Sequence, residues 1–319
     1  MIQTLAELSE ILRSTILKDS NIASLEIPKS QQLAFAIEVL PSQMLDCWHL
    51  LRLLVNDTEM YPVLSNCWLA GTGNWQQNMD RQNFFIRSEY IYEQQNSSIE
   101  NIAPKSIIDA AKSINGEKVI KRRIKEYDRE DNQEWWESKL YLQDLEVTEK
   151  DYGIAPKLRE AEAALNFEEI ITDIDFERWL LTWESKNVPK EQLLAPPNLA
   201  YQDWYDINPN YTMPLLLLPT LNSWETLAYI HFFGATNSAE DIAILKYWYD
   251  RYGAELVAHY GTMLQFCVRN KPQTLMEAYE LAAQHYEFAP CTLILPGVSI
   301  REHARALLHI ERWFLHERP

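Results

Sequence analysis

The sequence predicts an α+β fold, with a mostly antiparallel sheet of hairpins in the C-terminal part, backed by helices, and a helix-rich, charged middle segment. The run Met213–Leu218 is apolar throughout, which is typical of a fully buried strand. Apolar residues alternate on both sides of Gly261-Thr262, which favours a hairpin that turns there. From about residue 71 to residue 197 polar and charged residues dominate, and apolar ones recur at helical intervals. Because hairpins and helices are separated along the chain, the sequence favours α+β over a doubly wound sheet.

Residues 1–70 are expected to form a helix–strand–helix–strand unit. An apolar stripe at helical spacing runs along residues 2–18, and Thr4 and Glu7 stand at capping-box spacing at its start. Alternating apolar residues predict a strand over 35–39, which Pro41 ends. The two remaining elements expected are a helix over 44–55 and a strand over 61–68.

Residues 71–197 are expected to form a charged, mostly helical middle segment that ends in a linker. Apolar residues recur every three or four positions around Ile107 and again around Ile120. A stronger apolar helical face follows at Phe176, Trp179, Leu180 and Trp183. The prolines of residues 189–197 indicate a boundary near residue 197.

Residues 198–319 are expected to form the C-terminal α+β domain. Gly253 is suited to the left-handed position after a helix, so we expect a helix over 239–252 to end there and a strand to begin. The remaining expected elements are strands over 213–218 and 227–233, a turn over 234–238, hairpin strands over 256–260 and 264–268, and helices over 275–286 and 299–315.

The order of several residues in this last part resembles a known family. Trp224-Glu225 comes first, then Phe233-Gly234, and then Tyr247-Trp248 followed closely by the run YGAEL. This series resembles the family called domain of unknown function 4253 over about residues 213–315, and residues 48–64 resemble its N-terminal part more loosely. The resemblance implies fold and domain placement, but no activity, because none is assigned to the family.

The sequence also departs from the family pattern at two places. The loop of residues 234–239 reads GATNSA, where the family usually has a run closer to GGWN with a following cysteine and proline. Cys291 stands where an aspartate is expected after the Tyr-Phe-Pro stretch. If that loop forms a site in the family, this member has altered it.

The net charge of the chain restricts the kinds of partner that it can bind. The chain has 46 acidic and 29 basic residues and a formal net charge of -17, which repels nucleic acid and anionic membrane surfaces and attracts a basic protein. The longest apolar run is far shorter than the ~20 residues that span a bilayer, and no secretory leader is recognised, so a cytoplasmic protein is expected. The four cysteines, far apart in sequence, are expected to be buried thiols in a reducing compartment: Cys47, Cys67, Cys267 and Cys291.

No common catalytic motif is present. Gly71-Thr72-Gly73 has neither the third glycine of a dinucleotide site nor the lysine of a phosphate loop. The basic run of residues 118–125 lies among acidic neighbours, which is typical of a solvated helix and not of an RNA site. Trp135-Trp136, placed among charges, is the aromatic pair most suited to an exposed interface.

A candidate pocket is predicted from the C-terminal residues, with no cofactor expected. Its members are Trp224, Glu225, His231, Gly234, Asn237, Trp248, Tyr252, Glu255 and His259. Two histidines and two glutamates among them could act as acid and base, and His231 and His259 are the weak candidates for metal ligands. In the alternative interpretation, each histidine is an ordinary strand residue and Glu255 caps or pairs locally.

Three functions remain open. The preferred hypothesis is a non-catalytic protein of the inhibitor or toxin-neutralising type, which masks a basic partner by electrostatic complementarity. The first alternative is a small-molecule enzyme or metal-dependent hydrolase, with its pocket where Trp224, Gly234 and Tyr252 converge. The second is a structural or oligomerising module that buries an apolar face against its own copy.

Overall fold

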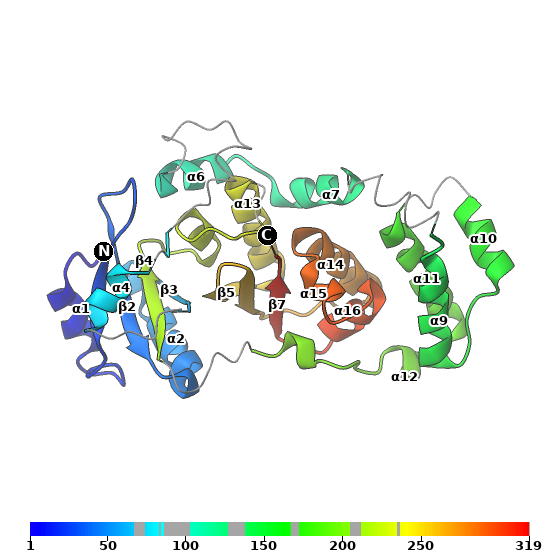
Figure 1. The fold of residues 1–319 in the computed structure, drawn as a ribbon, viewed down its shortest axis with the longest axis horizontal. Coiled ribbons are helices and arrows are strands. Elements are labelled where there is room, and N and C mark those ends of the chain that lie inside the picture. The colour runs from blue at the N-terminus through cyan, green and yellow to red at the C-terminus, as the bar shows by residue number, and fades with distance from the viewer. Residues whose placement is uncertain are drawn as a thin grey trace. The chain divides into compact units, whose positions relative to one another are not determined.

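The structure, a computed structural model, describes most of the chain (Figure 1). The described residues are 1–66, 74–82, 84–85, 103–126, 138–166 (without the side chains of 165 and 166), 172–204, 212–234 and 237–318. They form two compact units. Unit 1 comprises residues 1–119, 203–270 and 312–319, and unit 2 comprises residues 120–202 and 271–311. This division differs from the three segments expected from the sequence, because strands from both ends of the chain pair in one sheet.

The described part of unit 1 contains a seven-stranded sheet in the order β1-β2-β4-β3-β5-β6-β7 (Figure 1). Its strands are β1 Ile22–Glu26, β2 Leu33–Val39, β3 Tyr61–Leu64, β4 Met213–Leu218, β5 Glu255–His259, β6 Met263–Cys267 and β7 Arg312–His316. Neighbouring strands are antiparallel except β3 and β5, which are parallel. The predicted α+β class with a mostly antiparallel sheet is confirmed.

Strand β4 lies inside the sheet, between β2 and β3. All six of its side chains are buried, and successive side chains of a strand point to opposite faces, so both faces of the sheet are covered here. This explains the unbroken apolar run in the sequence. Leu215 and Leu217 belong to a core with Trp48, whose indole nitrogen donates a hydrogen bond to the carbonyl of Pro62 at 3.0 Å.

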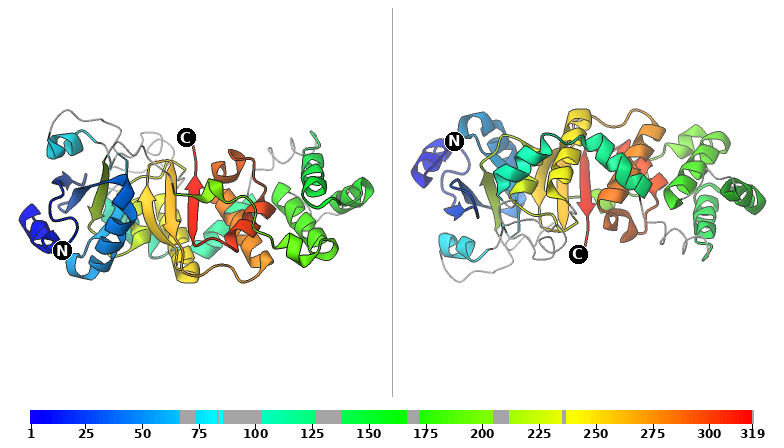
Figure 2. Two further views of the ribbon diagram at one scale, coloured as in Figure 1. Left: turned by 90° about the horizontal axis from the view of Figure 1, so that it is seen from below. Right: turned by 90° about the horizontal axis from the view of Figure 1, so that it is seen from above.

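Several helices belong to unit 1 (Figure 2). They are α1 Leu5–Leu12, α2 Met44–Leu53, α3 Val55–Thr58, α4 Trp75–Asp80, α6 Pro104–Ala111 and α13 Ser238–Tyr252, with the 3-10 helices η1 Pro41–Gln43 and η4 Ser223–Ala228. Helix α7, Gly116–Glu126, begins in unit 1. Thr4 and Glu7 form the expected capping box at the start of α1. Helix α6 lies against α13, and both contact η4.

The bend between α13 and β5 is as predicted. Gly253 has φ +63°, the left-handed conformation, and its N–H donates to the carbonyl of Tyr249 at 2.8 Å. Strands β5 and β6 form the expected hairpin, which turns at Gly261 with φ +82°. Leu264 and Phe266 of β6 are buried, as is Val268 just beyond it.

Two predicted elements are wrong. Residues 227–233 form no strand: they contain the end of η4 and an irregular stretch, and their apolar character reflects burial of residues such as Leu227 and Phe232. The helix expected over 299–315 ends at Leu307, and the chain continues into β7, which pairs with β6. Trp313 and Leu315 alternate toward the core, which is a strand pattern too short to be separated from the preceding helix by periodicity.

Two further differences concern the N-terminal region. Helix α1 is shorter than expected, and Ile16, the last residue of the predicted stripe, is 64% exposed. Strand β1 was not predicted. It pairs with β2 at the edge of the sheet, so only part of its surface is buried and its sequence, IASLE, lacks a strong apolar signal.

Unit 2 is helical in its described part. Its helices are α9 Tyr141–Tyr152, α10 Leu158–Asn166, α11 Asp173–Asn187, α12 Lys190–Leu193, α14 Leu275–Phe288, α15 Cys291–Ile294 and α16 Ile300–Leu307, with the 3-10 helix η3 Ala200–Gln202. Helix α16 packs on α14 and α11. Phe176, which is fully buried, stacks on Trp179 with ring centroids 5.5 Å apart. In the described residues of either unit, no helix has the length and apolar composition needed to cross a membrane.

Candidate functional site

Two residues of the predicted pocket line one cavity in unit 1. Trp224 and Glu225, both in η4, contribute to a cavity of about 400 Å³ whose other walls are α6, the first residues of α7, and α13. We call it the Trp224 cavity. The Glu225 carboxylate accepts a hydrogen bond from the Thr220 hydroxyl. The other predicted members lie elsewhere and do not line this cavity.

The two predicted histidines are buried in unit 1. His259 is fully buried, and burial, reinforced by the charge of His231, lowers the pKa of His259 to about 3. Its Nδ1 accepts a hydrogen bond from the N–H of Gly261 at 3.1 Å. A neutral imidazole held in this way fits a structural role better than proton transfer near neutral pH.

Glu255 is held by arginines. Its carboxylate receives two hydrogen bonds from Arg52, at 2.6 and 2.9 Å, and lies 3.7 Å from a guanidinium nitrogen of Arg269. The side-chain hydrogen bond to Glu255 is the largest cause that raises the pKa of Arg52. This agrees with the local pairing considered as the alternative for Glu255.

The remaining predicted residues stabilise the fold. Trp248 and Tyr252 pack on Trp313 with ring centroids 6.0 and 5.8 Å away. Asn237 caps the start of α13, accepting from the N–H groups of residues 239 and 240. Gly234 lies so close to Glu317 that an added Cβ would be 2.8 Å from its side chain.

Some of the other features named from the sequence lie within the described residues, and others do not. In the described residues no group of three His, Cys, Asp or Glu side chains is arranged to hold a metal ion. Arg122 of the basic run pairs with Glu126 one turn along α7, at 3.6 Å. The Gly71-Thr72-Gly73 run and the Trp135-Trp136 pair lie outside the described residues.

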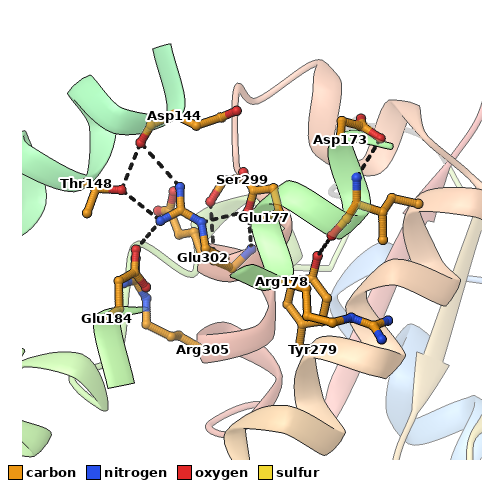
Figure 3. A network of polar contacts seen from close by, with 12 residues as sticks. Asp144, Thr148, Asp173, Glu177, Arg178, Glu184, Tyr279, Ser299, Glu302 and Arg305 are labelled. Carbon is orange, nitrogen blue, oxygen red and sulfur yellow. Dashed lines mark hydrogen bonds and ion pairs between the residues drawn. The ribbon is translucent and has the colours of Figure 1, made fainter. Parts of the chain in front are cut away.

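Unit 2 contains a charged cluster in which Figure 3 labels Thr148, Glu177 and Glu184. At its centre is Arg301 of α16. Its Nε donates to Glu177 at 2.8 Å, and its Nη1 donates to Thr148 at 2.9 Å and also to Glu184. The side chains of Arg301, Glu177 and Glu184 are 3%, 7% and 1% exposed. Asp144, whose backbone carbonyl lies 3.5 Å from Nη2, completes the cluster.

One guanidinium serves several carboxyl groups in this cluster, so they compete for it. Burial, followed by the charge of Glu177, raises the pKa of Asp144 to about 8. Burial also raises the pKa of Glu184 to about 7, although the charge of Arg301 opposes it. Burial lowers the pKa of Arg301, but the charges of Glu177 and Glu184 outweigh it and the net shift is upward. The cluster therefore holds protons that ordinary carboxyl groups release well below neutral pH.

A pocket of about 500 Å³ opens beside this cluster, within unit 2. Four acidic residues line it, and none of the described lining residues is a lysine or an arginine. The acidic residues are Asp144, Asp173, Glu177 and Glu302. Burial raises the pKa of Asp173 to about 6 and also raises that of Glu302. We call this the carboxyl pocket.

Apolar side chains complete the wall of the carboxyl pocket. Leu140, Val147 and Ile294 line it, and each is exposed to solvent. Ile294 is followed by a further exposed residue, Leu295, at the end of α15. The pocket thus combines buried and half-buried acidic groups with an exposed apolar rim.

Sequence reasoning missed this pocket. A usable signal was present, because Asp173, Glu177 and Glu184 are spaced by four and seven residues and lie on one face of a helix. Acidic residues on the inner face of a helix need a partner. The partner, Arg301, is more than a hundred residues away in sequence, and no local pattern connects the two.

Comparison with known proteins gives a family match for the last third of the chain. Residues 214–316 match the sequence model of the family described as Domain of unknown function (DUF4253). The match agrees with the resemblance found from the sequence and includes Trp224, Arg301 and the strands β5 to β7. No curated protein and no solved structure matches the chain.

Proposed function

We propose that this protein is a non-catalytic binding protein that holds a basic segment of a partner protein at the carboxyl pocket of unit 2. The observation that carries this proposal is the pocket itself, with four acidic residues and no lysine or arginine among the described lining residues. A lysine or arginine side chain is the protein group that complements such a wall.

The charge balance of the cluster supports a cationic ligand. Arg301 is already engaged by Glu177 and Glu184, and no described lysine or arginine lines the pocket. Asp173 accepts a hydrogen bond from a neutral group, the Tyr286 hydroxyl. A cation within about 4–6 Å of a carboxyl group lowers its pKa and favours its charged form. Entry of a basic side chain would therefore displace protons from the pocket, and its binding should strengthen as pH rises through the raised pKa values.

The apolar rim supports a polypeptide as the source of that cation. Lysine and arginine carry long methylene stems that pack on apolar surface while the charged head reaches a polar group. Leu140, Val147 and Ile294 provide such a surface around the carboxyl groups. The net charge of -17 would accelerate encounter with a basic partner.

We place this binding in the cytoplasm, and not on nucleic acid or a membrane surface. No disulfide joins the described cysteines, Cys47, Cys267 and Cys291, which suits a reducing compartment. The acidic charge opposes contact with phosphate backbones and anionic lipids.

One observation favours a second candidate, an enzyme that uses the same pocket. With a pKa of about 8, Asp144 stays largely protonated at neutral pH and could donate a proton to a leaving group. The test is turnover of a panel of aryl glycosides and aryl esters. Hydrolysis that Asp144→Asn abolishes would support this candidate, and no turnover of any panel member would remove it.

Peptide binding tests the main proposal. The probe is a fluorescein-labelled peptide that contains lysine and leucine, and its matched partner has glutamine at each lysine position. We expect the lysine peptide to bind, with affinity that falls as salt rises, and the glutamine peptide to bind at least about tenfold more weakly. Equal binding of both peptides would contradict the proposal.

A pair of double variants locates the binding. The double variant Asp173→Asn with Glu302→Gln removes two charges from the pocket. We expect it to weaken binding of the lysine peptide about tenfold. Glu146→Gln with Glu149→Gln removes the same charge from the exposed side of α9 and should change affinity less than about twofold. If both variants weaken binding equally, the effect is general charge and not this pocket.

A further inference from the structure

The Trp224 cavity of unit 1 differs in character from the carboxyl pocket. Part of its lining is apolar and comes from two helices, with Ile108 and Ala111 from α6 and Ile242 and Ala243 from α13. At about 400 Å³ it falls within the roughly 300–1,000 Å³ of small-molecule sites. Its size and lining are therefore those of a ligand pocket and not of a packing defect.

Close packing fixes the walls of this cavity. Gly116, at the start of α7, lies so near α13 that an added Cβ would be 2.0 Å from the carbonyl oxygen of Ala243. Trp224 is held on the other side, with Tyr249 at 4.6 Å between ring centroids and the Lys246 ammonium 5.6 Å from the indole centroid. The cavity is thus preformed, which lowers the cost of binding.

Charged side chains of both signs line the cavity, and they come from different elements. Lys112 directly follows α6, Glu225 lies on η4, and Lys246 with Asp250 lies on α13. The hydrogen bond from Lys112 to Asp109, at 2.7 Å, is the main cause that raises the pKa of Lys112, and the charge of Glu225 adds to it. Because the pair with Asp109 is exposed and therefore weak, a ligand carboxylate can compete for Lys112. A ligand with a single charge would meet a repelling group here, whereas a zwitterion can match both.

We propose that the Trp224 cavity binds a small zwitterion with an apolar body, of which a free hydrophobic amino acid is the simplest representative. The ligand carboxylate pairs with Lys112 and its ammonium group with Glu225, while its side chain packs on Ile108 and Ile242. This inference does not depend on the peptide-binding function, because the cavity and the carboxyl pocket lie in different units.

Calorimetry of the whole protein tests the inference. The probes are leucine, phenylalanine and methionine, together with two leucine analogues: leucinamide, which lacks the carboxylate, and 4-methylpentanoate, which lacks the ammonium group. We expect at least one of the three amino acids to bind and both leucine analogues to bind about tenfold or more weakly than leucine. Absence of binding by all three amino acids, or analogue binding as strong as that of leucine, would overturn it.

Variants test which residue binds the carboxylate of the ligand and which binds its ammonium group. Lys112→Gln should weaken leucine binding and abolish the preference for leucine over leucinamide. Glu225→Gln should abolish the preference for leucine over 4-methylpentanoate. Lys105→Gln, an exposed lysine of α6 outside the cavity, is the matched control and should leave every affinity unchanged. Equal effects of Lys112→Gln and Lys105→Gln would place the ligand elsewhere.

Discussion

Arg301 donates a hydrogen bond from Nε to the Glu177 carboxylate at 2.8 Å, inside unit 2 and nearly out of contact with solvent. The same guanidinium also binds Glu184 and Thr148. A buried ion pair of this kind contributes little net stability compared with apolar residues, but removal of one partner leaves the others charged and unpaired. The cluster therefore fixes the relative positions of α9, α11 and α16 and shapes the wall of the carboxyl pocket.

Arg301→Met is expected to destabilise the protein by about 3–5 kcal/mol, because Glu177 and Glu184 lose their shared partner. Urea unfolding at neutral pH measures this. Arg178→Met is the matched control, since Arg178 is a partly exposed arginine of α11 paired with Glu280, and it should cost less than about 1 kcal/mol. Similar losses in the two variants would show that the buried cluster has no special role.

The contribution of Asp144 to the free energy of unfolding should fall as pH rises from about 4 to about 8. In this interval the native state keeps a proton on Asp144, with its pKa raised to about 8, that the unfolded chain has released. For this group the unfolded state binds fewer protons, so its contribution to the slope of stability against pH is negative. Urea unfolding of the natural protein and of Asp144→Asn across this range isolates that contribution, and the stability of the natural protein relative to the variant should fall as pH rises. Parallel curves for the variant and the natural protein would refute the shifted pKa.

Ile294→Ser is expected to weaken binding of the lysine peptide about fivefold, without changing the stability of the protein by more than about 0.5 kcal/mol. Ile294 is 59% exposed and lines the carboxyl pocket, so its contribution is to the bound segment and not to the core. Met276→Ser, an exposed apolar residue of α14 outside the pocket, is the control. Unchanged affinity in Ile294→Ser would exclude the apolar rim from the interface.

Gly253→Ala should destabilise the protein by about 1 kcal/mol or more, because φ is +63° and the new Cβ would meet the Arg269 side chain. Gly253→Asn should cost less, since asparagine tolerates the left-handed conformation better. Thermal unfolding compares the two. If the Gly253→Ala variant is as stable as the natural protein, the bend does not require the left-handed conformation.

The sheet could be predicted from the sequence where the signal is local. The apolar run of β4, the hairpin at Gly261 and the helix end at Gly253 each depend on a few adjacent residues. Strand β1 lies at the sheet edge and β7 follows closely after α16, so neither shows a long pattern of its own. The pairing of β3 with β5 joins residues far apart in the chain, and no short window contains it.

Less of the candidate sites than of the fold could be predicted from the sequence. Trp224 and Glu225 do line a cavity, but its opposite wall comes from α6, in a segment expected only to be helical. The carboxyl pocket depends on charges buried on inner helix faces, which resemble a solvated face until the partner arginine is known. Composition gives the net charge of the chain, but not where acidic groups converge.

The proposed function requires that a basic segment of the partner binds at the carboxyl pocket. Carbodiimide cross-linking tests this directly, because it joins a peptide lysine to a protein carboxyl group only when the two are in contact, and mass spectrometry then identifies the residue. We predict that Asp173 and Glu302 carry most of the cross-links to the lysine peptide. Cross-links spread over exposed carboxyl groups such as Glu146 and Glu149, with none in the pocket, would contradict the proposed function.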